Sequence, residues 1–326
     1  MDYIKLIGGL LLLVVSGDYL VRGGVAIASK LKISTLVIGM TVVAFGTSAP
    51  ELLVSVQAAL MGNPEIAIGN VVGSNIANIA FILGLTALVY PLVVSKNSIK
   101  IDWPMMMIAT ILFLFAASNG EISRIEGLSG FMILVFFVIF QIYKSRKENI
   151  ASEEQEIPQI PIWLAIVYII GSGAGLAFGA DFLIDGASNI AKSLGVSERI
   201  IGVSIVAFGT SLPELAASLS AALKKETDIA IGNIIGSNIF NILCVIGLTS
   251  LIKPINLDWN TFSYDFYWML AISFLLLLLI IPFWIIMKKR KNIISLPEFI
   301  LNNSKLGRIG GIILAISYIY YIYTLF

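Results

Sequence analysis

Long apolar segments separated by short polar loops run through almost the whole chain of 326 residues. A helix needs about 20 mainly apolar residues to cross a bilayer. Ten segments meet this criterion, at about 4–28, 33–60, 65–90, 100–118, 125–143, 161–190, 199–223, 228–252, 264–287 and 307–325. The first segment is too long for the apolar part of a cleavable signal peptide. The pattern therefore predicts an all-α integral membrane protein with ten transmembrane helices.

Composition supports a membrane protein. Hydrophobic residues make up 58% of the chain and charged residues only 13%, whereas about a quarter of the residues in a soluble domain are charged. The apolar excess has to be covered by the lipid bilayer, which we expect to be the protein's surroundings. A net charge of +1 provides no field that would attract nucleic acid.

The basic residues indicate how the helices are oriented. If the N-terminus is outside, fifteen of the 21 Lys and Arg residues fall in inner loops and five in outer loops, with Arg22 inside the first span. Cytoplasmic loops of multi-pass proteins carry such an excess of Lys and Arg. We therefore expect a multi-pass protein of the cell membrane with both termini outside.

The chain contains an internal repeat. Residues 39–91 align without a gap to residues 202–254, and 30 of these 53 positions are identical. Five predicted spans lie in each half, so the second copy would enter the membrane from the opposite side. We expect two inverted five-helix repeats, 1–143 and 161–326, joined by a cytoplasmic linker, 144–160. Inverted repeats are typical of secondary transporters, whose ion sites lie near the midplane where the repeats meet.

Each repeat places a carboxylate inside a predicted span, in the motifs AFGTSAPE and AFGTSLPE, which end at Glu51 and Glu214. A charged side chain at the bilayer centre costs about 2.5–3.5 kcal/mol even on the milder insertion scale. A bound cation would compensate this cost. The alternative is that each glutamate forms a structural ion pair with a basic residue. The sequence disfavours it, because no Lys or Arg lies near the middle of any predicted span.

A proline precedes each glutamate, Pro50 in the first repeat and Pro213 in the second. Proline removes one helical hydrogen bond and displaces the carbonyl four residues earlier. We therefore predict proline-broken core helices whose freed carbonyls, at 44–47 and 207–210, are candidate cation ligands. A simple packing kink is the alternative interpretation.

Hydroxyl and amide side chains accompany the glutamates at helical spacing. In the first repeat, Thr47 and Ser48 precede Glu51 by four and three positions and so share its helix face, as Ser211 shares that of Glu214 in the second. The second motif pairs Ser74 with Asn78, four positions apart. Its repeat copy pairs Ser237 with Asn241.

Two glycines of the second motif, Gly73 and Gly236, would let another helix approach closely. Small-residue packing explains these glycines, but it does not explain the paired Ser and Asn residues as well.

The remaining composition limits the ligand chemistry. The chain has no histidine and a single cysteine, Cys244, so only oxygen ligands remain, which suit Na⁺, Ca²⁺ or Mg²⁺. Roughly a dozen oxygens are available, and Ca²⁺ takes 6–8 of them. Two carboxylates balance one Ca²⁺, and competition between Ca²⁺ and Na⁺ for them would produce exchange.

The paired motifs GTSAPE…GNVVGSNIAN and GTSLPE…GNIIGSNIFN resemble the two alpha repeats of the cation/calcium exchanger superfamily, and most closely its prokaryotic sodium/calcium exchangers. The resemblance covers nearly the whole chain. It implies a secondary antiporter that exchanges Na⁺ for Ca²⁺ by alternating access, with three Na⁺ per Ca²⁺ and net charge movement. Na⁺ and Ca²⁺ would be its transported substrates, and no cofactor or obligatory protein partner is expected.

The resemblance also assigns ligands. It implies that Glu51 and Glu214 are shared by the calcium and sodium sites, with backbone carbonyls of Thr47 and Thr210 on calcium. The remaining implied ligands form two sodium sites and a central position. They are Ala44, Ser48 and Ser74 for one sodium site, Ala207, Ser211 and Ser237 for the other, and Asn78 and Asn241 at the centre.

Three positions bear on the coupling ion. Potassium-dependent relatives carry Asp at the place of Asn241, so we expect no potassium requirement. Proton/calcium relatives carry Asn where Ser48 and Ser211 stand, which argues against proton coupling. An H⁺- or K⁺-coupled Ca²⁺ exchanger is the alternative function, and an intramembrane protease with two catalytic carboxylates is a third that the duplicated hydroxyls disfavour. We therefore do not expect an enzyme.

One further carboxylate pair is interpreted as structural. Asp18 and Asp181 match across the repeat, and Asp18 can pair with Arg22 one helical turn later.

Overall fold

The computed structural model describes residues 2–149, 160–195, 209–281 and 304–325. In chain order the elements are α1 (Asp2–Leu31), α2 (Thr35–Ile38), η1 (Gly39–Val43), α3 (Ala44–Thr47), α4 (Ala49–Leu60), α5 (Pro64–Ile76), η2 (Ala77–Leu83), α6 (Gly84–Val89), β1 (Leu92–Val93), η3 (Ser98–Asp102), α7 (Trp103–Ala117), β2 (Glu121–Ile122), α8 (Arg124–Asn149), α9 (Ile162–Ser193), α12 (Leu212–Leu223), α13 (Thr227–Phe240), η5 (Asn241–Ile246), α14 (Gly247–Ile252), β3 (Ile255–Asn256), α15 (Trp259–Ile280), β4 (Lys305–Leu306) and α18 (Arg308–Thr324), where η marks a π-helical segment.

The helices confirm a multi-pass membrane protein. Within the described residues, seven helical segments are long and apolar enough to cross a bilayer, and a bent pair of helices forms an eighth candidate. Two shorter apolar helices, α12 and α18, lie in two further predicted spans. Each of the ten predicted spans thus contains a described helix, while the number of complete crossings stays a prediction.

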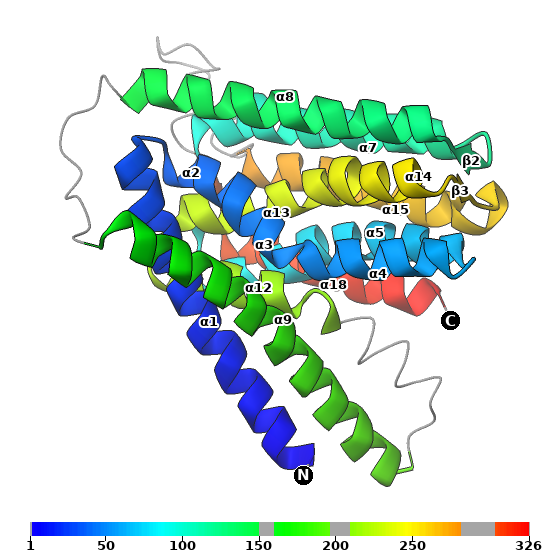
Figure 1. Cartoon of the computed structure of the whole chain (residues 1–326), viewed down its shortest axis with the longest axis horizontal. Helices are drawn as coiled ribbons and strands as arrows, with labels where there is room; N and C mark the ends of the chain where they lie inside the picture. Colours follow the sequence, from blue (N-terminus) through cyan, green and yellow to red (C-terminus); the bar gives the residue numbers. More distant parts are fainter. Residues whose placement is uncertain (1, 150–159, 196–208, 282–303, 326) are drawn as a thin grey trace.

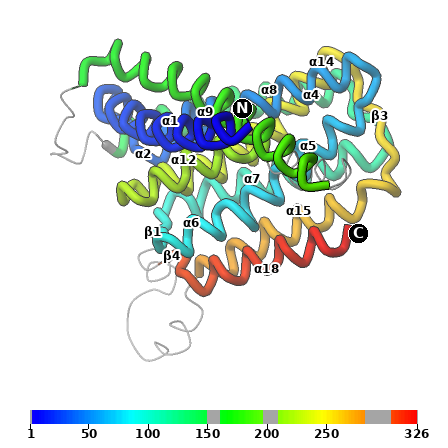
Figure 2. The backbone as a smooth tube through the Cα atoms, turned by 90° about the horizontal axis from the view of Figure 1, so that it is seen from below, coloured from blue at the N-terminus to red at the C-terminus, as the bar shows by residue number. Residues whose placement is uncertain are grey.

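The helices form a central group and a tilted outer pair (Figure 1). An 18-residue stretch of the continuous segment α13–η5–α14 is entirely buried, and the corresponding stretch of α5–η2–α6 is largely buried. The long helices α1 and α9 lie side by side and cross the rest of the molecule at an angle. Figure 2 shows α18 beside α15 on the opposite side of the molecule. The motifs GNVVGSNIAN and GNIIGSNIFN therefore lie in the most buried of the described helical segments.

Small residues bring the outer pair into backbone contact. A Cβ built on Gly9 of α1 would lie 2.6 Å from the backbone nitrogen of Leu183 in α9. A Cβ on Gly17 would lie 2.8 Å from the carbonyl oxygen of Ala216 in α12. Such contacts between small residues are how helices associate where lipid removes the hydrophobic driving force.

Ionic contacts tie α1 to the end of α12. The predicted pair is present, since Arg22 Nε lies 2.7 Å from Asp18 Oδ2. The ammonium group of Lys224, the residue after α12, also contacts the Asp18 carboxylate. Asp18 therefore joins two elements in addition to stabilising its own helix.

Two antiparallel pairs of two-residue strands interrupt an otherwise all-helical fold. Strand β1 pairs with β4, and β2 pairs with β3. Each pair joins an element of the first half of the chain to one of the second half. These strands were not predicted, because two-residue segments in polar loops produce no periodic pattern.

Two predicted helix boundaries are wrong: α8 continues to Asn149, past the predicted end at residue 143, and α15 starts earlier than predicted. The ninth span was expected to start near residue 264, but α15 begins at Trp259. Asp258 caps it, because its carboxylate accepts a hydrogen bond from the Asn260 N–H (3.1 Å) and another from the Thr261 hydroxyl (2.8 Å). The cap extends the helix through polar residues that the hydropathy criterion excluded.

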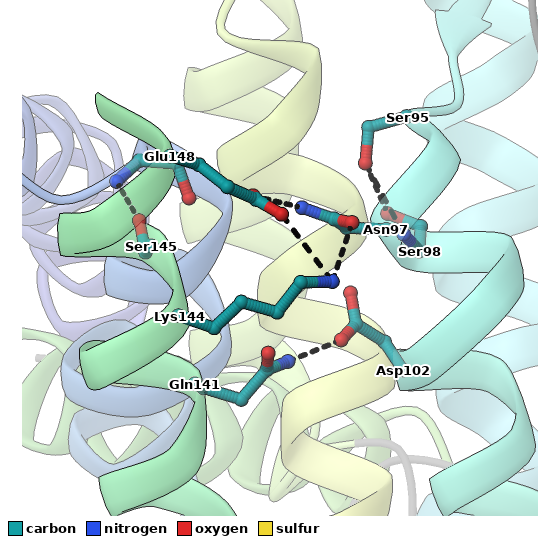
Figure 3. A network of polar contacts seen from close by, with 9 residues as sticks. Ser95, Asn97, Ser98, Asp102, Gln141, Lys144, Ser145 and Glu148 are labelled. Atoms are coloured by element: carbon teal, nitrogen blue, oxygen red, sulfur yellow. Dashed lines mark hydrogen bonds and ion pairs between the residues drawn. The ribbon is translucent and has the colours of Figure 1, made fainter. Parts of the chain in front are cut away.

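In each half of the chain, a carboxylate on the fourth helix accepts a hydrogen bond from the fifth. Asp102, at the end of η3, is fully buried and accepts a hydrogen bond from Gln141 of α8 (Figure 3). Asp265 of α15, 163 positions later, accepts a bond of 2.9 Å from the hydroxyl of Tyr321 in α18. The second oxygen of Asp102 has no hydrogen-bond partner, so Gln141 supplies the hydrogen bond that this carboxylate receives.

We predict that Gln141→Leu lowers the stability of the protein by about 1–3 kcal/mol, the cost of leaving a buried polar group without its partner. The measurement is the melting temperature of the detergent-purified protein. The double variant Asp102→Leu with Gln141→Leu serves as the control, because removing both partners leaves no orphaned charge. A double variant as unstable as Gln141→Leu would contradict this account.

Candidate cation-binding site

The first repeat bends where the sequence predicts a break. The helical segments Thr35–Thr47 and Ala49–Leu60 meet at an angle of 44°. Ser48 lies between them with φ −89° and ψ 5°, outside the helical region. Pro50 follows and has no N–H to donate to the Gly46 carbonyl. The break places Glu51 in the first turn of α4, where the positive end of the helix dipole favours a carboxylate.

The second repeat has the same local geometry. Ser211 has φ −89° and ψ 3°, and Glu214 stands in the first turn of α12. Pro213 occupies the position that corresponds to Pro50. The described residues resume at Gly209, so the predicted ligand Ala207 lies outside them.

The predicted site residues are brought together in the centre of the molecule. Glu51 and Glu214 are both completely buried. The other predicted residues that the structure describes are also buried, except for half-buried Thr210. The buried ones are Ala44, Thr47, Ser48, Ser74, Asn78, Ser211, Ser237 and Asn241.

Glu214 is held by hydroxyls from two elements. The Ser48 hydroxyl donates to Glu214 Oε1 at 3.1 Å, and the Ser237 hydroxyl lies 3.5 Å from the same oxygen. Ser48 belongs to the first repeat, so its hydrogen bond reaches across to the glutamate of the second. Sequence spacing had instead placed Ser48 with Glu51.

Three carboxylate oxygens of the site remain without a partner. They are Oε1 and Oε2 of Glu51 and Oε2 of Glu214, all inaccessible to solvent. No Lys or Arg in the described part of the chain forms an ion pair with either glutamate. Two buried carboxyl groups thus offer acceptor oxygens in the centre of the molecule, and a divalent cation would neutralise them.

Hydroxyl and amide oxygens must complete any cation shell. In the described residues there is no group of three or more His, Cys, Asp or Glu side chains that could hold a metal ion. The ligand set is therefore hard and poor in charge. Such a set suits Na⁺ and Ca²⁺ better than a transition metal.

Thr47 joins the two repeats through its side chain. Its hydroxyl lies 3.1 Å from Asn233 Oδ1 and 3.3 Å from the hydroxyl of Ser237. It also donates to the carbonyl oxygen of Ala44 (3.2 Å), which accepts the Ser48 N–H as well. The Ala44 carbonyl, predicted to be freed by the proline, thus accepts two hydrogen bonds in this structure. The resemblance implied a backbone role for Thr47, and helical spacing placed its side chain on the face of Glu51, so its contact with α13 is an addition.

Two asparagines that sequence reasoning missed support the glutamate turns. Asn70 donates to the backbone carbonyl of Glu51 (3.1 Å) and to the hydroxyl of Ser55 (3.0 Å). Asn233 makes the matching contacts in the second repeat, including a bond of 2.9 Å to Ser218. Each pair is identical at a separation of 163 residues, and that identity was the available signal.

The close approach predicted for Gly236 is present, but the one predicted for Gly73 is not, because a Cβ built on Gly73 would meet no atom within 4 Å. A Cβ on Gly236 would lie 2.5 Å from the carbonyl oxygen of Met40 and 2.9 Å from the Ala44 Cβ. The helix α13 therefore packs directly on η1 and α3. This contact places Ser237 within reach of Thr47.

A cavity of about 810 Å³ borders the site between α4 and α9. Pro50, Thr210 and Pro213 are among its lining residues. Most of the remaining lining is apolar, and among the residues that the structure describes Asp181 of α9 is the one ionisable side chain in it. The cavity brings an open volume to the break in both core helices.

The chain is similar to known membrane exchangers over nearly its whole length. The family described as "Sodium/calcium exchanger protein" matches residues 2–143 and 164–326. CaxA of Alkalimonas amylolytica is 40% identical over 324 residues, which cover 98% of this chain and 96% of CaxA. The sodium/calcium exchanger MaX1 of Methanosarcina acetivorans is 32% identical over 322 residues, covering 87% of this chain and 92% of MaX1.

The fold agrees with a solved exchanger. The structure of the sodium-calcium exchanger NCX_Mj, soaked with Na⁺ and Ca²⁺, matches with a TM-score of 0.81 and 31% sequence identity. The match covers all of this chain and 98% of NCX_Mj. The duplicated motifs, the central carboxylates and these matches lead to one conclusion: the chain belongs to the sodium/calcium exchanger family, as a prokaryotic-type member of the cation/calcium exchanger superfamily.

Proposed function

We propose that this protein is a secondary antiporter that exchanges Na⁺ for Ca²⁺ by alternating access. The observation that carries the proposal is the pair Glu51 and Glu214, completely buried, with three unbonded oxygens and no ion pair among the described residues. A buried charge in a membrane protein is retained where it serves an ion pathway. Family membership and the name of MaX1 support sodium and calcium as the ions.

The ligands are proposed in three groups. Glu51 and Glu214 are shared by all ions, and the backbone carbonyls of Thr47 and Thr210 bind Ca²⁺. The remaining ligands are Ala44, Ser48 and Ser74 for one Na⁺ site, Ala207, Ser211 and Ser237 for the other, and Asn78 and Asn241 between them. Contacts of Ser48 and Ser237 with the Glu214 carboxylate support this grouping.

Exchange follows from shared ligands. Two carboxylates neutralise the charge of one Ca²⁺ or of two Na⁺. Binding of either ion therefore lowers the affinity of the site for the other. The proposed stoichiometry of three Na⁺ per Ca²⁺ moves one net positive charge in each cycle. The transporter is then sensitive to membrane potential.

The arrangement in the membrane is also a proposal. We place two inverted five-helix halves, 1–143 and 161–326, in the cell membrane, joined by the linker 144–160 on the cytoplasmic side and with both termini outside. Reciprocal contacts between the halves support the inversion. One example is the pairing of β1 with β4 and of β2 with β3.

The deciding experiment is ⁴⁵Ca²⁺ uptake into Na⁺-loaded proteoliposomes. Uptake is expected only when an outward Na⁺ gradient is present. Matched vesicles contain K⁺ or an acidic interior in place of Na⁺. Equal uptake from those vesicles would assign the protein to a potassium- or proton-coupled exchanger instead.

We predict that Glu214→Gln abolishes exchange, because it removes one of the two charges that balance Ca²⁺ and leaves the carboxylate of Glu51 alone. Glu121→Gln is the matched control, since Glu121 is exposed on β2 and the chemical change is the same. Uptake of ⁴⁵Ca²⁺ by both variants and the parent is compared at equal reconstituted amounts. Substantial exchange by Glu214→Gln would contradict the proposed site.

We predict that an inside-positive potential speeds Ca²⁺ uptake into Na⁺-loaded vesicles, because three Na⁺ leaving for one Ca²⁺ entering removes one positive charge from the interior. One charge across 100 mV is worth about 2.3 kcal/mol. External K⁺ with valinomycin sets the potential, and the same K⁺ without valinomycin tests for a direct effect of potassium. Uptake that is independent of potential would indicate two Na⁺ per Ca²⁺.

A further inference from the structure

Two buried asparagines beside the site have no assigned role. Asn75 of α5 and Asn238 of α13 stand 163 positions apart in the two copies of the motif GSN. Each is 1% exposed. Both lie three positions before the central asparagines, Asn78 and Asn241, so their side chains are close to the ion site.

These four asparagines form a reciprocal set of hydrogen bonds across the two halves. The amide nitrogen of Asn78 donates to Asn238 Oδ1 at 3.1 Å. The amide nitrogen of Asn241 donates to Asn75 Oδ1, also at 3.1 Å. Asn78 and Asn241 thus each donate a hydrogen bond to an asparagine of the other half of the chain.

Backbone carbonyls determine which way these amides point. An asparagine amide has nearly the same shape when its oxygen and nitrogen are exchanged, so its orientation is set by its partners. Asn238 Nδ2 lies 3.4 Å from the backbone oxygen of Asn75, and Asn75 Nδ2 lies 3.4 Å from that of Asn238. A backbone carbonyl can only accept, so both asparagines must turn their nitrogens toward it and their oxygens toward the central amides.

The orientation of Asn75 and Asn238 determines that of the central amides, Asn78 and Asn241. Because Asn238 and Asn75 present oxygens, Asn78 and Asn241 must present their nitrogens to them. The remaining oxygens, Asn78 Oδ1 and Asn241 Oδ1, are buried and have no hydrogen-bond partner. Like the three free carboxylate oxygens, they are acceptors without a donor. Leaving such a group unpaired costs about 1–3 kcal/mol, which a bound cation would offset.

We propose that Asn75 and Asn238 are positioning residues that fix the amide oxygens of Asn78 and Asn241 toward the transported cation. This role rests on the proposed function. Without the two positioning residues, either central amide could rotate and turn its NH₂ group to the ion. With them, the centre of the site offers acceptor oxygens only and gains no charge beyond the two glutamates.

The test is a double-mutant cycle read out by Ca²⁺ binding to the purified protein. The variants are Asn238→Ala, Asn78→Ala and their combination, measured by titration calorimetry in Na⁺-free buffer. We expect each single change to weaken Ca²⁺ binding by about tenfold, which corresponds to 1.4 kcal/mol. The combination should be little weaker than either single variant, because Asn238 acts through Asn78.

A crossed pair provides the matched control. Asn75 and Asn78 are not bonded to each other, so the effects of Asn75→Ala and Asn78→Ala should add. The maximal exchange rate and the half-saturating Ca²⁺ concentration are measured in the same samples. Loss of a positioned ligand should raise the half-saturating concentration more than it lowers the maximal rate. If Asn238→Ala does not fold, the repeat-related cycle of Asn75 with Asn241 replaces it.

The outcomes separate the two proposals. Binding that is unchanged in Asn238→Ala, or additive losses in the bonded pair, would overturn the positioning role while exchange by the parent protein stands. A parent protein that binds neither Ca²⁺ nor Na⁺ would overturn the proposed function and, with it, the positioning role. Non-additive losses confined to the bonded pairs would establish the role.

Discussion

The fold is organised around two buried carboxylates with which no Lys or Arg of the described residues forms an ion pair. Glu51 and Glu214 are inaccessible to solvent, and a charge in such a place is costly unless something compensates it. Lysine or arginine would remove the cost permanently, and with it the capacity to bind an exchangeable ion. Under the proposed function, a pair without a basic partner would depend on mobile cations for its neutralisation, and the surrounding structure would have to tolerate that.

The surrounding structure meets this requirement with neutral polar groups. Hydroxyls of Ser48 and Ser237 contact Glu214, and Asn70 and Asn233 hold the turns that carry the two glutamates. Each of these groups adds dipoles without adding charge. The glycine at position 236 lets α13 approach η1 closely enough for such short contacts to form. The packing of small residues and the chemistry of the site are therefore one arrangement.

Much of this arrangement could be read from the sequence. The apolar segments predicted where helices lie, and the positions of Pro50 and Pro213 predicted the breaks that precede the glutamates. Partners across helices could not be predicted, because local spacing places residues on a face without saying which helix meets that face. Ser48 illustrates the point, since it bonds Glu214 of the other repeat. Asn75 and Asn238 were as well matched as the predicted ligands, but identity alone does not separate a ligand from a residue that orients one.

The reciprocal asparagine contacts bear on the origin of the chain. Residue 78 of one half meets residue 238 of the other, and residue 241 meets residue 75 in return. This exchange is the signature of an isologous interface, the kind formed by two identical subunits around a two-fold axis. A half-length ancestor that paired with a second copy of itself about such an axis would already have possessed all four asparagines in contact. Fusion of two such genes would have preserved a working interface and then freed each half to diverge at its periphery.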